Sequence, residues 1–519
     1  MGVERHMGSF SRQETGNAFY EFRDVNMSNS QYVCNPPEGT FHQIRMNPKD
    51  RNLLESLHRN FPFSPTVEQG QLLKELLRFA LYSERFELFL LKGYAGTGKT
   101  TVVSTLVNSL GDVGLRSVLL APTGRAAKVI SRYSNRVAHT IHRKIYFASR
   151  HPDGSVSLVL QKNKHRNTIF IADEASMISD HDSDLRTLSS RSLLEDLLRY
   201  VYTGKNCKLI LVGDTAQLPP VGLALSPALD PDVFRERFRM KVSVFELSEV
   251  MRQHERSGVL FNATRIRARI KQGSPGPTKF DLSYPDIQRL QDPYDTQDAI
   301  QEAFTGGEEN TVFIVRSNRR ANLYNHQIRI SVLGLDDEIA AGDRVMVVKN
   351  NYFWLEDSEH VGFIANGDIC ELLEIFNYRE LHGFRFAEVK LRLVDYEDQP
   401  PFEAVILLDT LHSETASLSQ EDGYRLYHSV AEDYAHLRDR QKRLAAIKGD
   451  KFFNALQIKF AYALTCHKTQ GGQWPTVFIE QPYLPEGEDI SYLRWLYTGV
   501  TRAQEKLYLI GFPDECFEE

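Results

Sequence analysis

Apolar and polar positions alternate in a regular way from about residue 65 onward. Short apolar runs have the length of buried strands, and helical patterns with one apolar face separate them. One such helix begins at Thr66-Val67-Glu68-Gln69. Buried strands that alternate with helices predict an α/β fold, in which helices cover both faces of a parallel sheet. The strand candidates are 88–91, 117–121, 168–172 and 208–212.

A second α/β block begins with the apolar run 311–315, and its later strands follow only at 476–480 and 506–511. The stretch between them contains short β-like runs and an Asn366-Gly367 turn signal. A helical stretch at 419–448 follows these runs. We therefore predict a small β-barrel with a helical arm, inserted at 345–455. The barrel strand candidates are 343–349, 361–365, 368–377, 384–394 and 402–409.

Composition sets limits on the class of protein. A chain of 519 residues, 42% of them apolar, predicts several domains. It has no run of 18 apolar residues and no apolar leader, so we expect a cytoplasmic protein without a membrane span. Five scattered cysteines without a CxxC pair indicate neither a disulfide framework nor a zinc site. The net charge of −6 neither indicates nor excludes nucleic-acid binding. Residues 1–45 are polar and aperiodic, which predicts a disordered tail.

A glycine-rich segment from Gly93 to Thr100 fits the phosphate-binding P-loop pattern G-x-x-x-x-G-K-[ST]. A strand candidate precedes it and a helix candidate follows it, which argues against a chance match. We expect backbone N–H groups to surround the phosphates of ATP, Lys99 to reach the β- and γ-phosphates, and Thr100 to bind Mg²⁺. The nucleotide-binding candidates are Gln69, Gly93, Ala95, Gly96, Thr97, Gly98, Lys99, Thr100 and Thr101.

Two adjacent acids, Asp173 and Glu174, end the apolar strand candidate at 168–172. Alone they are as well explained by a helix cap as by catalysis. Together with the P-loop they indicate a hydrolytic site, in which Asp173 holds Mg²⁺ and Glu174 orients and deprotonates the attacking water.

Six further segments resemble the motifs of superfamily 1 helicases, in the same order and with the same placement. The RecD-like, Dda-like branch fits best, because of the Gln-Leu-Pro-Pro-Val-Gly and His-Lys-Thr-Gln-Gly runs and the barrel before the second run. The resemblance covers about 63–512. The segments are 121–127, 138–142, 213–222, 247–253, 461–471 and 497–503.

This resemblance implies two RecA-like motor domains, at 46–235 and at 236–344 with 456–519, and an SH3-like barrel inserted in the second. It implies an ATP-dependent DNA helicase that translocates 5′ to 3′ on single-stranded DNA. Gln217 is expected to sense the γ-phosphate. Arg252 and Arg502 of the second domain are expected to act as arginine fingers across the domain boundary. The alternative for each arginine is a surface ion pair of little energetic value.

Gln69 has two competing interpretations. In such helicases a glutamine just before the first motor domain contacts adenine. However, Thr66-x-x-Gln69 is also a capping box, in which the glutamine amide bonds back to the start of its own helix.

The resemblance places single-stranded DNA across both motor domains. Hydroxyl, amide and imidazole groups suit contacts to phosphate and sugar that carry no base specificity. Each histidine has the alternative of a structural role within its own loop, and the basic segment 438–443 that of a solvated helix face. The DNA-contact candidates are Pro122, Thr123, Thr140, His142, Asn318, Thr465 and His467.

The segment 143–167 is longer than an ordinary connection of ~2–6 residues between elements. Pro152-Asp153-Gly154 is a turn signal, and alternating apolar residues flank it. We predict a β-hairpin that splits the duplex, with Tyr146 or Phe147 stacked on the last base pair. The alternative is that both aromatics anchor the hairpin to its own domain.

Three other functions stay open at this point. An RNA helicase of the Upf-like branch shares the motor motifs, and a 2′-hydroxyl contact cannot be read from sequence. A non-motor P-loop NTPase has no need of Gln217, Arg252 and the 461–471 run. A third possibility is the translocating subunit of a larger nuclease complex. For a helicase we expect a monomer that acts on single-stranded DNA and duplex junctions, with repair or replication proteins as possible partners.

Overall fold

The computed structural model describes residues 47–518, except 151–155, 181–191, 252–256, 274–276, 356–357, 359–361 and 397. The predicted tail at 1–45 lies outside the described residues. None of the described helices has the length and apolar character needed to cross a membrane.

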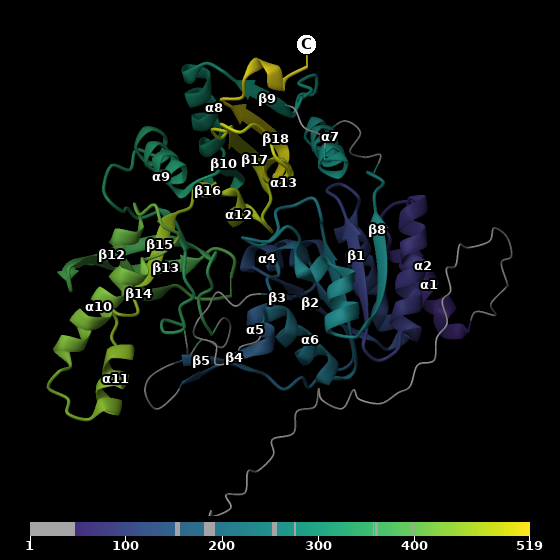
Figure 1. Ribbon diagram of the computed structural model, residues 1–519, viewed down its shortest axis with the longest axis horizontal. Coiled ribbons are helices and arrows are strands. Elements are labelled where there is room, and N and C mark those ends of the chain that lie inside the picture. The colour runs from purple at the N-terminus through teal and green to yellow at the C-terminus, as the bar shows by residue number, and fades with distance from the viewer. Residues whose placement is uncertain are drawn as a thin grey trace, which may run out of the picture. The chain divides into compact units, whose positions relative to one another are not determined.

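The first sheet is wholly parallel, with strands in the order β3-β2-β6-β7-β1-β8. Successive residues of its strands pack on opposite faces, because side chains alternate along a strand. Phe89 and Leu91 of β1 face one core with α1–α3, whereas Leu88 and Leu90 face another core with α6. The helices around this sheet are visible in Figure 1. The strands are β1 (Glu87–Gly93), β2 (Arg116–Ala121), β3 (Ala138–Thr140), β6 (Arg166–Ala172), β7 (Lys205–Gly213) and β8 (Lys241–Leu247). The helices are α1 (Pro48–Asn60), α2 (Val67–Tyr82), α3 (Lys99–Ser109), α4 (Gly124–Ser134), α5 (Ile141–Ile145) and α6 (Leu193–Thr203).

Strand β8 belongs to this first sheet, where it pairs with β1 along its whole length. The sequence interpretation placed residues 236–344 in the second α/β domain, so its boundary falls before the last strand of the first sheet. A strand that joins the sheet at its edge gives no local signal of which sheet it joins.

Strands β4 (Tyr146–Arg150) and β5 (Val156–Leu160) form a separate antiparallel pair within the segment for which the spacing predicts a hairpin. Tyr146 and Leu160 face each other on one side of this pair and pack on the core of the first sheet. Phe147 and Val159 face each other on the opposite side and are exposed.

The second sheet is also parallel, in the order β16-β10-β17-β18-β9. The predicted strands at 311–315, 476–480 and 506–511 correspond to β10, β17 and β18, whereas β9 and β16 were not predicted. The strands are β9 (Ile287–Leu290), β10 (Thr311–Val315), β16 (Ala463–Thr465), β17 (Trp474–Glu480) and β18 (Ala503–Ile510). The helices are α7 (Gly258–Gln272), α8 (Pro293–Thr305), α9 (Asn318–Gln327), α12 (Cys466–Thr469) and α13 (Ile490–Val500).

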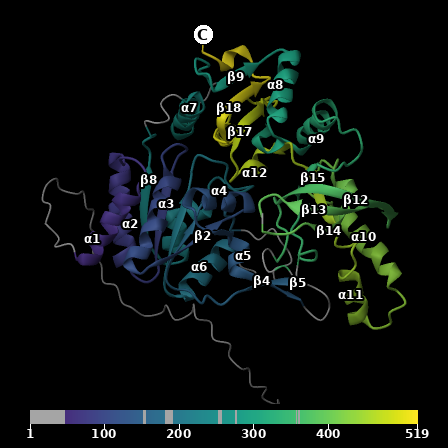
Figure 2. The same cartoon turned by 180° about the vertical axis from the view of Figure 1, so that it is seen from behind.

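Five strands between β10 and β16 close into a barrel, which confirms the predicted small barrel. The strand predicted at 361–365 is wrong, because in its described part, 362–365, only Ile364 pairs, through an isolated bridge to Asn351. The fifth barrel strand is β15, which the sequence interpretation assigned to the second motor domain. Helices α10 (Gln420–Asp433) and α11 (Arg440–Lys448) pack against the barrel through Leu426, Val430 and Ile447 (Figure 2). The strands are β11 (Arg344–Val347), β12 (Ile369–Leu381), β13 (Phe384–Leu393), β14 (Phe402–Leu407) and β15 (Leu456–Phe460).

Candidate nucleotide site and nucleic-acid interface

The glycine-rich loop joins β1 to α3 in the conformation that a phosphate cradle requires. Gly96 and Gly98 have φ angles of +75° and +82°, which side chains disfavour. Lys99 and Thr100 begin α3, with Thr101 next in its first turn. The Lys99 ammonium donates a 2.8 Å hydrogen bond to the Tyr94 carbonyl, so it lies over the loop itself. The structure therefore brings the predicted P-loop residues together at one helix N-terminus.

The Gln69 amide acts as a helix cap and as a brace for the P-loop. Its oxygen accepts a 3.0 Å hydrogen bond from Thr66 N–H, and its nitrogen donates a 3.0 Å hydrogen bond to the Thr97 carbonyl. The side chain is buried. The capping-box interpretation is thus what the structure shows. An adenine contact requires the amide to leave at least one of these two partners.

The paired acids follow directly after β6. The Asp173 N–H donates a 2.9 Å hydrogen bond to the Leu120 carbonyl of β2, which fixes the turn beside the P-loop. Burial and the neighbouring Glu174 raise the pKa of Asp173 to about 7, although Lys99 acts in the opposite direction. Glu174 has a φ angle of +53°, an unusual backbone conformation for a residue with a side chain. Burial thus favours the protonated form of Asp173 unless a positive charge compensates its carboxylate.

The loop after β7 is held from the side of the second sheet. Leu218 N–H donates a 2.9 Å hydrogen bond to the Thr498 hydroxyl of α13, and the Leu218 carbonyl accepts one of 2.7 Å from Gln470. Gln217 is buried, and its side-chain oxygen has no hydrogen-bond donor among the described residues. The amide predicted to sense the γ-phosphate therefore has an unused acceptor.

Tyr497 of α13 is a site residue that the sequence analysis did not single out. Its hydroxyl accepts a 2.9 Å hydrogen bond from Ala95 N–H of the P-loop and donates a 2.7 Å hydrogen bond to Asp214. Burial and Asp214 raise the pKa of Tyr497 further above its ordinary value, so the phenol stays protonated. Tyr497 opens the helicase-like segment 497–503, but a tyrosine in an apolar helix gives no sign of its partner.

Arg502 follows α13 and is buried. It donates hydrogen bonds of 3.0 Å and 3.1 Å to the carbonyls of Thr498 and Gly472, and it lies 3.9 Å from the Glu174 carboxylate. This arrangement excludes the alternative of an exposed surface ion pair.

Arg252, the other predicted arginine finger, lies outside the described residues. Its neighbour Met251 is described, and Met251 N–H donates a 3.1 Å hydrogen bond to the Gly96 carbonyl of the P-loop. The chain therefore passes the P-loop immediately before Arg252.

The predicted DNA contacts of the first domain lie at the carboxyl ends of β2 and β3. Thr123 and Thr140 cap α4 and α5, and their hydroxyls accept 3.2 Å hydrogen bonds from backbone N–H groups. Pro122 precedes Thr123 and is half-buried, as is His142, whose ring lies 5.8 Å from that of Tyr146. Each hydroxyl accepts as a cap through its oxygen, so its O–H group can still donate to a phosphate or sugar oxygen.

The predicted contacts of the second domain also lie at strand ends. Asn318 begins α9 and donates a 3.1 Å hydrogen bond to the Glu414 carbonyl. Thr465 ends β16 without a capping hydrogen bond, so its hydroxyl is free of that role. The His467 ring is exposed, and partial desolvation together with the charge of Arg316 lowers its pKa. His467 is therefore a neutral hydrogen-bonding group near pH 7.

The two hairpin aromatics have different environments. Tyr146 is buried, and its hydroxyl donates a 2.8 Å hydrogen bond to Asp196 of α6. Phe147 is 48% exposed. The anchoring alternative therefore holds for Tyr146, and only Phe147 is placed to meet a base.

A second feature absent from the sequence analysis joins α5 to the barrel. Arg143 donates hydrogen bonds of 2.9 Å to the Phe363 carbonyl and 3.0 Å to Asp368, and its guanidinium stacks 4.0 Å from the Tyr396 ring centroid. Burial raises the pKa of Asp368 to about 6, although Arg143 opposes this. We call this group the Arg143–Asp368 clasp.

Comparisons with known proteins match both halves of this arrangement. Residues 66–274 match a family described as an AAA domain, and residues 460–510 match the UvrD-like helicase C-terminal domain. The chain is 24% identical to the ATP-dependent RecD2 DNA helicase of Deinococcus radiodurans, over 82% of this chain and 47% of that protein. It is 23% identical to the ATP-dependent DNA helicase dda of Enterobacteria phage T4, over 81% of this chain and 93% of that protein.

The crystal structure of a Pif1 helicase from Bacteroides in complex with ADP-AlF3 and ssDNA aligns with a TM-score of 0.44 at 15% identity, over 88% of this chain and 95% of that one. The sequence matches confirm the resemblance to superfamily 1 helicases of the RecD-like and Dda-like branch. The chain spans about half the length of the RecD2 relative.

Proposed function

We propose that this chain is an ATP-dependent DNA helicase that translocates 5′ to 3′ on single-stranded DNA. In this proposal the first and second parallel sheets are the cores of two RecA-like motor domains. The first domain runs to the end of β8, and the SH3-like barrel includes β15. Hydrolysis of ATP between the two domains changes how they meet, and this change moves the DNA.

The observation that carries the proposal is the position of Arg502. It belongs to the second sheet's α13–β18 connection, yet it lies 3.9 Å from Glu174, which belongs to the first sheet. A residue that touches the general base from the other domain makes hydrolysis depend on domain arrangement. An enzyme that only hydrolyses or transfers phosphate has no need of this dependence.

The remaining groups fit ATP hydrolysis. Lys99 would leave the Tyr94 carbonyl to bind the β- and γ-phosphates, and Glu174 would orient and deprotonate water. Thr100 and Asp173 would hold Mg²⁺, since hydroxyl and carboxylate oxygens suit it and burial disfavours an uncompensated Asp173 anion. Mg²⁺ would neutralise phosphate charge. The side-chain oxygen of Gln217, which has no partner among the described residues, would accept a hydrogen bond from a water at the γ-phosphate.

On the DNA side, the candidates cluster at the carboxyl ends of β2, β3, β10 and β16. This edge is where parallel sheets bind ligands. Thr465 and His467 have side chains available for phosphate and sugar, and Thr123 and Thr140 keep their O–H donors although their oxygens cap α4 and α5. The β4–β5 hairpin, with Phe147 exposed, would separate the strands at a duplex junction.

The test is steady-state ATPase of the purified chain without nucleic acid, with poly(dT) and with poly(U). It is paired with unwinding of duplexes that carry a 5′ or a 3′ tail. We expect strong stimulation by poly(dT) and unwinding of the 5′-tailed duplex only. A Glu174→Gln preparation controls for contaminating ATPase.

Each alternative has its own result in the same assay. Equal or greater stimulation by poly(U) would replace DNA with RNA as the substrate. ATPase that no nucleic acid stimulates would refute the motor, and unwinding from a 3′ tail would refute the polarity.

A further inference from the structure

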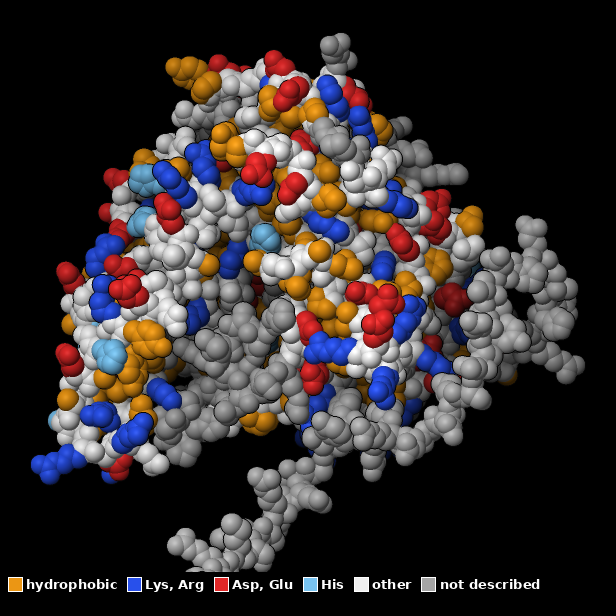
Figure 3. Space-filling view, in the orientation of Figure 1, with side chains coloured by type: hydrophobic (Ala, Val, Ile, Leu, Met, Phe, Trp, Pro, Cys, Tyr) orange, Lys and Arg blue, Asp and Glu red, His pale blue; other side chains and the backbone are white. Residues whose placement is uncertain are grey.

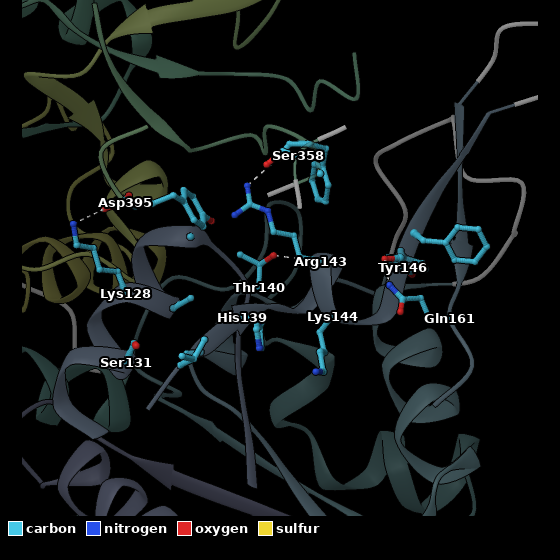
Figure 4. Close-up of a pocket in the computed structure, with 18 of the residues that line it drawn as sticks. Lys128, Ser131, His139, Thr140, Arg143, Lys144, Tyr146, Gln161, Ser358 and Asp395 are labelled. Carbon is cyan, nitrogen blue, oxygen red and sulfur yellow. Dashed lines mark hydrogen bonds and ion pairs between the residues drawn. The ribbon is translucent and has the colours of Figure 1, made fainter. Parts of the chain in front are cut away.

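A large cavity lies beside the edge of the first sheet, apart from the nucleotide site. Its volume is about 1070 Å³, slightly above the ~300–1,000 Å³ of small-ligand pockets. It is lined by α4, β3, α5, α6, the β4–β5 hairpin with the residues that follow it, and two barrel loops. Figure 4 shows Arg143 directed toward the barrel loop of Ser358, and His139 and Lys144 directed to the other side of α5.

The lining is strongly cationic. Six Lys or Arg side chains line the cavity, against two Asp side chains, in a chain whose net charge is −6. Elsewhere, acidic and basic side chains are interspersed over the face shown in Figure 3. The positive charge of this cavity is therefore a local property. The basic side chains are Lys128, Arg132, Arg143, Lys144, Lys162 and Lys164.

Most of this charge is not neutralised within the described part of the chain. Lys128 lies 3.8 Å from Asp395, and Arg143 lies 3.0 Å from Asp368. No acidic partner occurs there for the other four, Arg132, Lys144, Lys162 and Lys164. Two nitrogens of Arg143, Nε and Nη1, are buried without an acceptor among the described residues. Desolvation lowers the pKa of Lys144. Desolvation and the charge of Lys144 also lower the pKa values of His139 and His165. A polyanion would satisfy these groups.

Neutral groups in the lining suit a nucleic-acid strand. Ser131, Gln161 and Gln399 offer hydroxyl and amide donors for phosphate or sugar oxygens. The ring of Phe147 is exposed and can stack on a base. Cations beside an exposed aromatic ring are the combination that binds single strands without sequence preference.

The lining also shows which strand fits. A strand that the motor moves must contact both motor domains, because its grip alternates between them. No residue of β9, β10, β16, β17, β18 or α13 lines the cavity, and of the contact candidates for the translocated strand only Thr140 does, at the N-terminus of α5. A strand held here touches the first domain, its hairpin and the barrel that is inserted in the second domain, but it does not touch the second sheet.

We propose that this cavity binds the phosphate backbone of the complementary strand, the one that the motor does not translocate, as it leaves the β4–β5 hairpin. This proposal rests on the proposed helicase function. The bound strand is kept from reannealing behind the hairpin, and the exposed Lys162 and Lys164 make the first phosphate contacts. We call this site the complementary-strand cavity.

The test combines a charge-removing variant with charge-removing DNA. The variant is Lys162→Ala with Lys164→Ala, and the matched control is Lys74→Ala with Lys271→Ala, two exposed lysines on α2 and α7. Equilibrium affinity without ATP is measured for a fork with natural phosphates. It is also measured for forks with neutral methylphosphonates near the junction, in either the complementary tail or the 5′ tail.

For wild type and the control, we expect several-fold weaker binding when the complementary tail is neutralised. The variant should bind the natural fork about tenfold more weakly, with a salt dependence lower by about one for each lost contact. Neutralising the complementary tail should not weaken the variant's binding any further, because the lysines and the phosphates that they contact contribute one shared interaction. Neutralising the 5′ tail should weaken binding of the variant as much as binding of wild type.

Two results would overturn the proposal. If the variant remains sensitive to the complementary tail, the cavity does not hold that strand. If it instead loses sensitivity to the 5′ tail, the cavity belongs to the translocated strand. Failure of the wild type to bind any fork, or to show DNA-stimulated ATPase, would refute the helicase function itself and is seen before any variant is compared.

Discussion

The Tyr497 hydroxyl donates a 2.7 Å hydrogen bond to the carboxylate of Asp214, from which it is separated by 283 positions in the sequence. The same hydroxyl accepts from Ala95 N–H, so one oxygen joins the P-loop, the loop after β7 and helix α13. In the proposed function, an ATP phosphate would compete with Tyr497 for the Ala95 N–H group. We therefore expect Tyr497 to link nucleotide binding to the attachment of α13.

Tyr497→Phe should remove the connection between α13, the P-loop and the loop after β7. We expect DNA-stimulated turnover to fall at least about tenfold, which corresponds to ~1.4 kcal/mol in the barrier, with a smaller change in KM for ATP. The loss of a buried partner should also lower the free energy of unfolding by ~1–3 kcal/mol. The measurement is kcat and KM with and without poly(dT), together with thermal unfolding.

Tyr462→Phe is the matched control for Tyr497→Phe. Tyr462 is also buried, and its hydroxyl donates to a carboxylate, Asp343, and accepts from a backbone N–H, that of Arg344. It lies on the barrel side of the second sheet, so its loss should lower stability and leave turnover unchanged. Equal loss of turnover in both variants would mean that Tyr497 acts only through stability.

Lys99→Ala should abolish ATP hydrolysis and leave single-strand affinity within about twofold of wild type. Lys99 bonds to the Tyr94 carbonyl of the P-loop and has no contact with the DNA candidates. Losing a phosphate-binding charge removes transition-state stabilisation without touching the DNA interface. Fluorescence anisotropy of a labelled single strand, measured beside ATPase, checks this. A parallel collapse of DNA affinity would contradict the separation of the two sites.

Arg502→Ala should lower turnover by about 10³-fold or more, as expected for an arginine finger, and affect ATP affinity far less. It should also lower stability, because Arg502 is buried and bonded to two carbonyls. Arg502→Lys keeps the positive charge but not the planar guanidinium with its several donors. It therefore separates the contribution of charge to turnover from that of the guanidinium hydrogen bonds. Turnover that returns to wild type in Arg502→Lys would leave only a charge requirement. Unchanged turnover in Arg502→Ala would assign the residue a structural role alone.

The Arg143–Asp368 clasp predicts a pH dependence of stability. The folded pKa of Asp368 is about 6, above its ordinary value of 3.8, so between these values the folded state binds the proton more tightly. The free energy of unfolding should therefore fall as pH rises from about 4 to about 6. Asp368→Asn should remove this part of the slope, which urea unfolding across pH 4–7 would reveal. An unchanged slope would mean that Asp368 titrates normally.

The sequence predicted the parts of the fold that carry a local signal. Strands β1, β6 and β7 could be predicted because each contains a continuous apolar run. The P-loop could be predicted because its glycines allow the positive φ angles found at Gly96 and Gly98. Strands of three or four residues, such as β3, β9 and β16, are too short for a periodicity. The assignment of β8 and β15 to their sheets depends on pairing with distant strands, which no local pattern encodes.

In the candidate site, too, the features with a local sequence signal were predicted, and those that depend on distant residues were not. The P-loop and the acids after β6 were predictable because their chemistry lies in consecutive residues. Tyr497 and the Arg143–Asp368 clasp were not, since each joins residues more than 200 positions apart. Gln69 was ambiguous for a different reason, because a single amide fits both a capping box and a ligand contact.

Phe147 provides the sharpest test of strand separation by the hairpin. Its ring is 48% exposed on the side of the β4–β5 pair opposite to Tyr146, which is buried on the core. Phe147→Ala removes an exposed ring, so the fold should be unaffected. Base–aromatic stacking contributes ~1–3 kcal/mol per base, so unwinding should slow by about tenfold or more. DNA-stimulated ATPase should stay within about twofold of wild type, because Phe147 contacts neither the nucleotide site nor the second sheet.

Two controls give the Phe147 result its meaning. Phe147→Trp keeps an aromatic ring and should preserve unwinding, whereas Phe147→Leu keeps apolar bulk and should not. Val159→Ala removes the exposed partner of Phe147 across the pair and should have little effect on either activity. Unwinding that survives in Phe147→Ala would show that the ring is not the separating element. Loss of ATPase and unwinding together would show that the hairpin supports the motor domain and does not split the duplex.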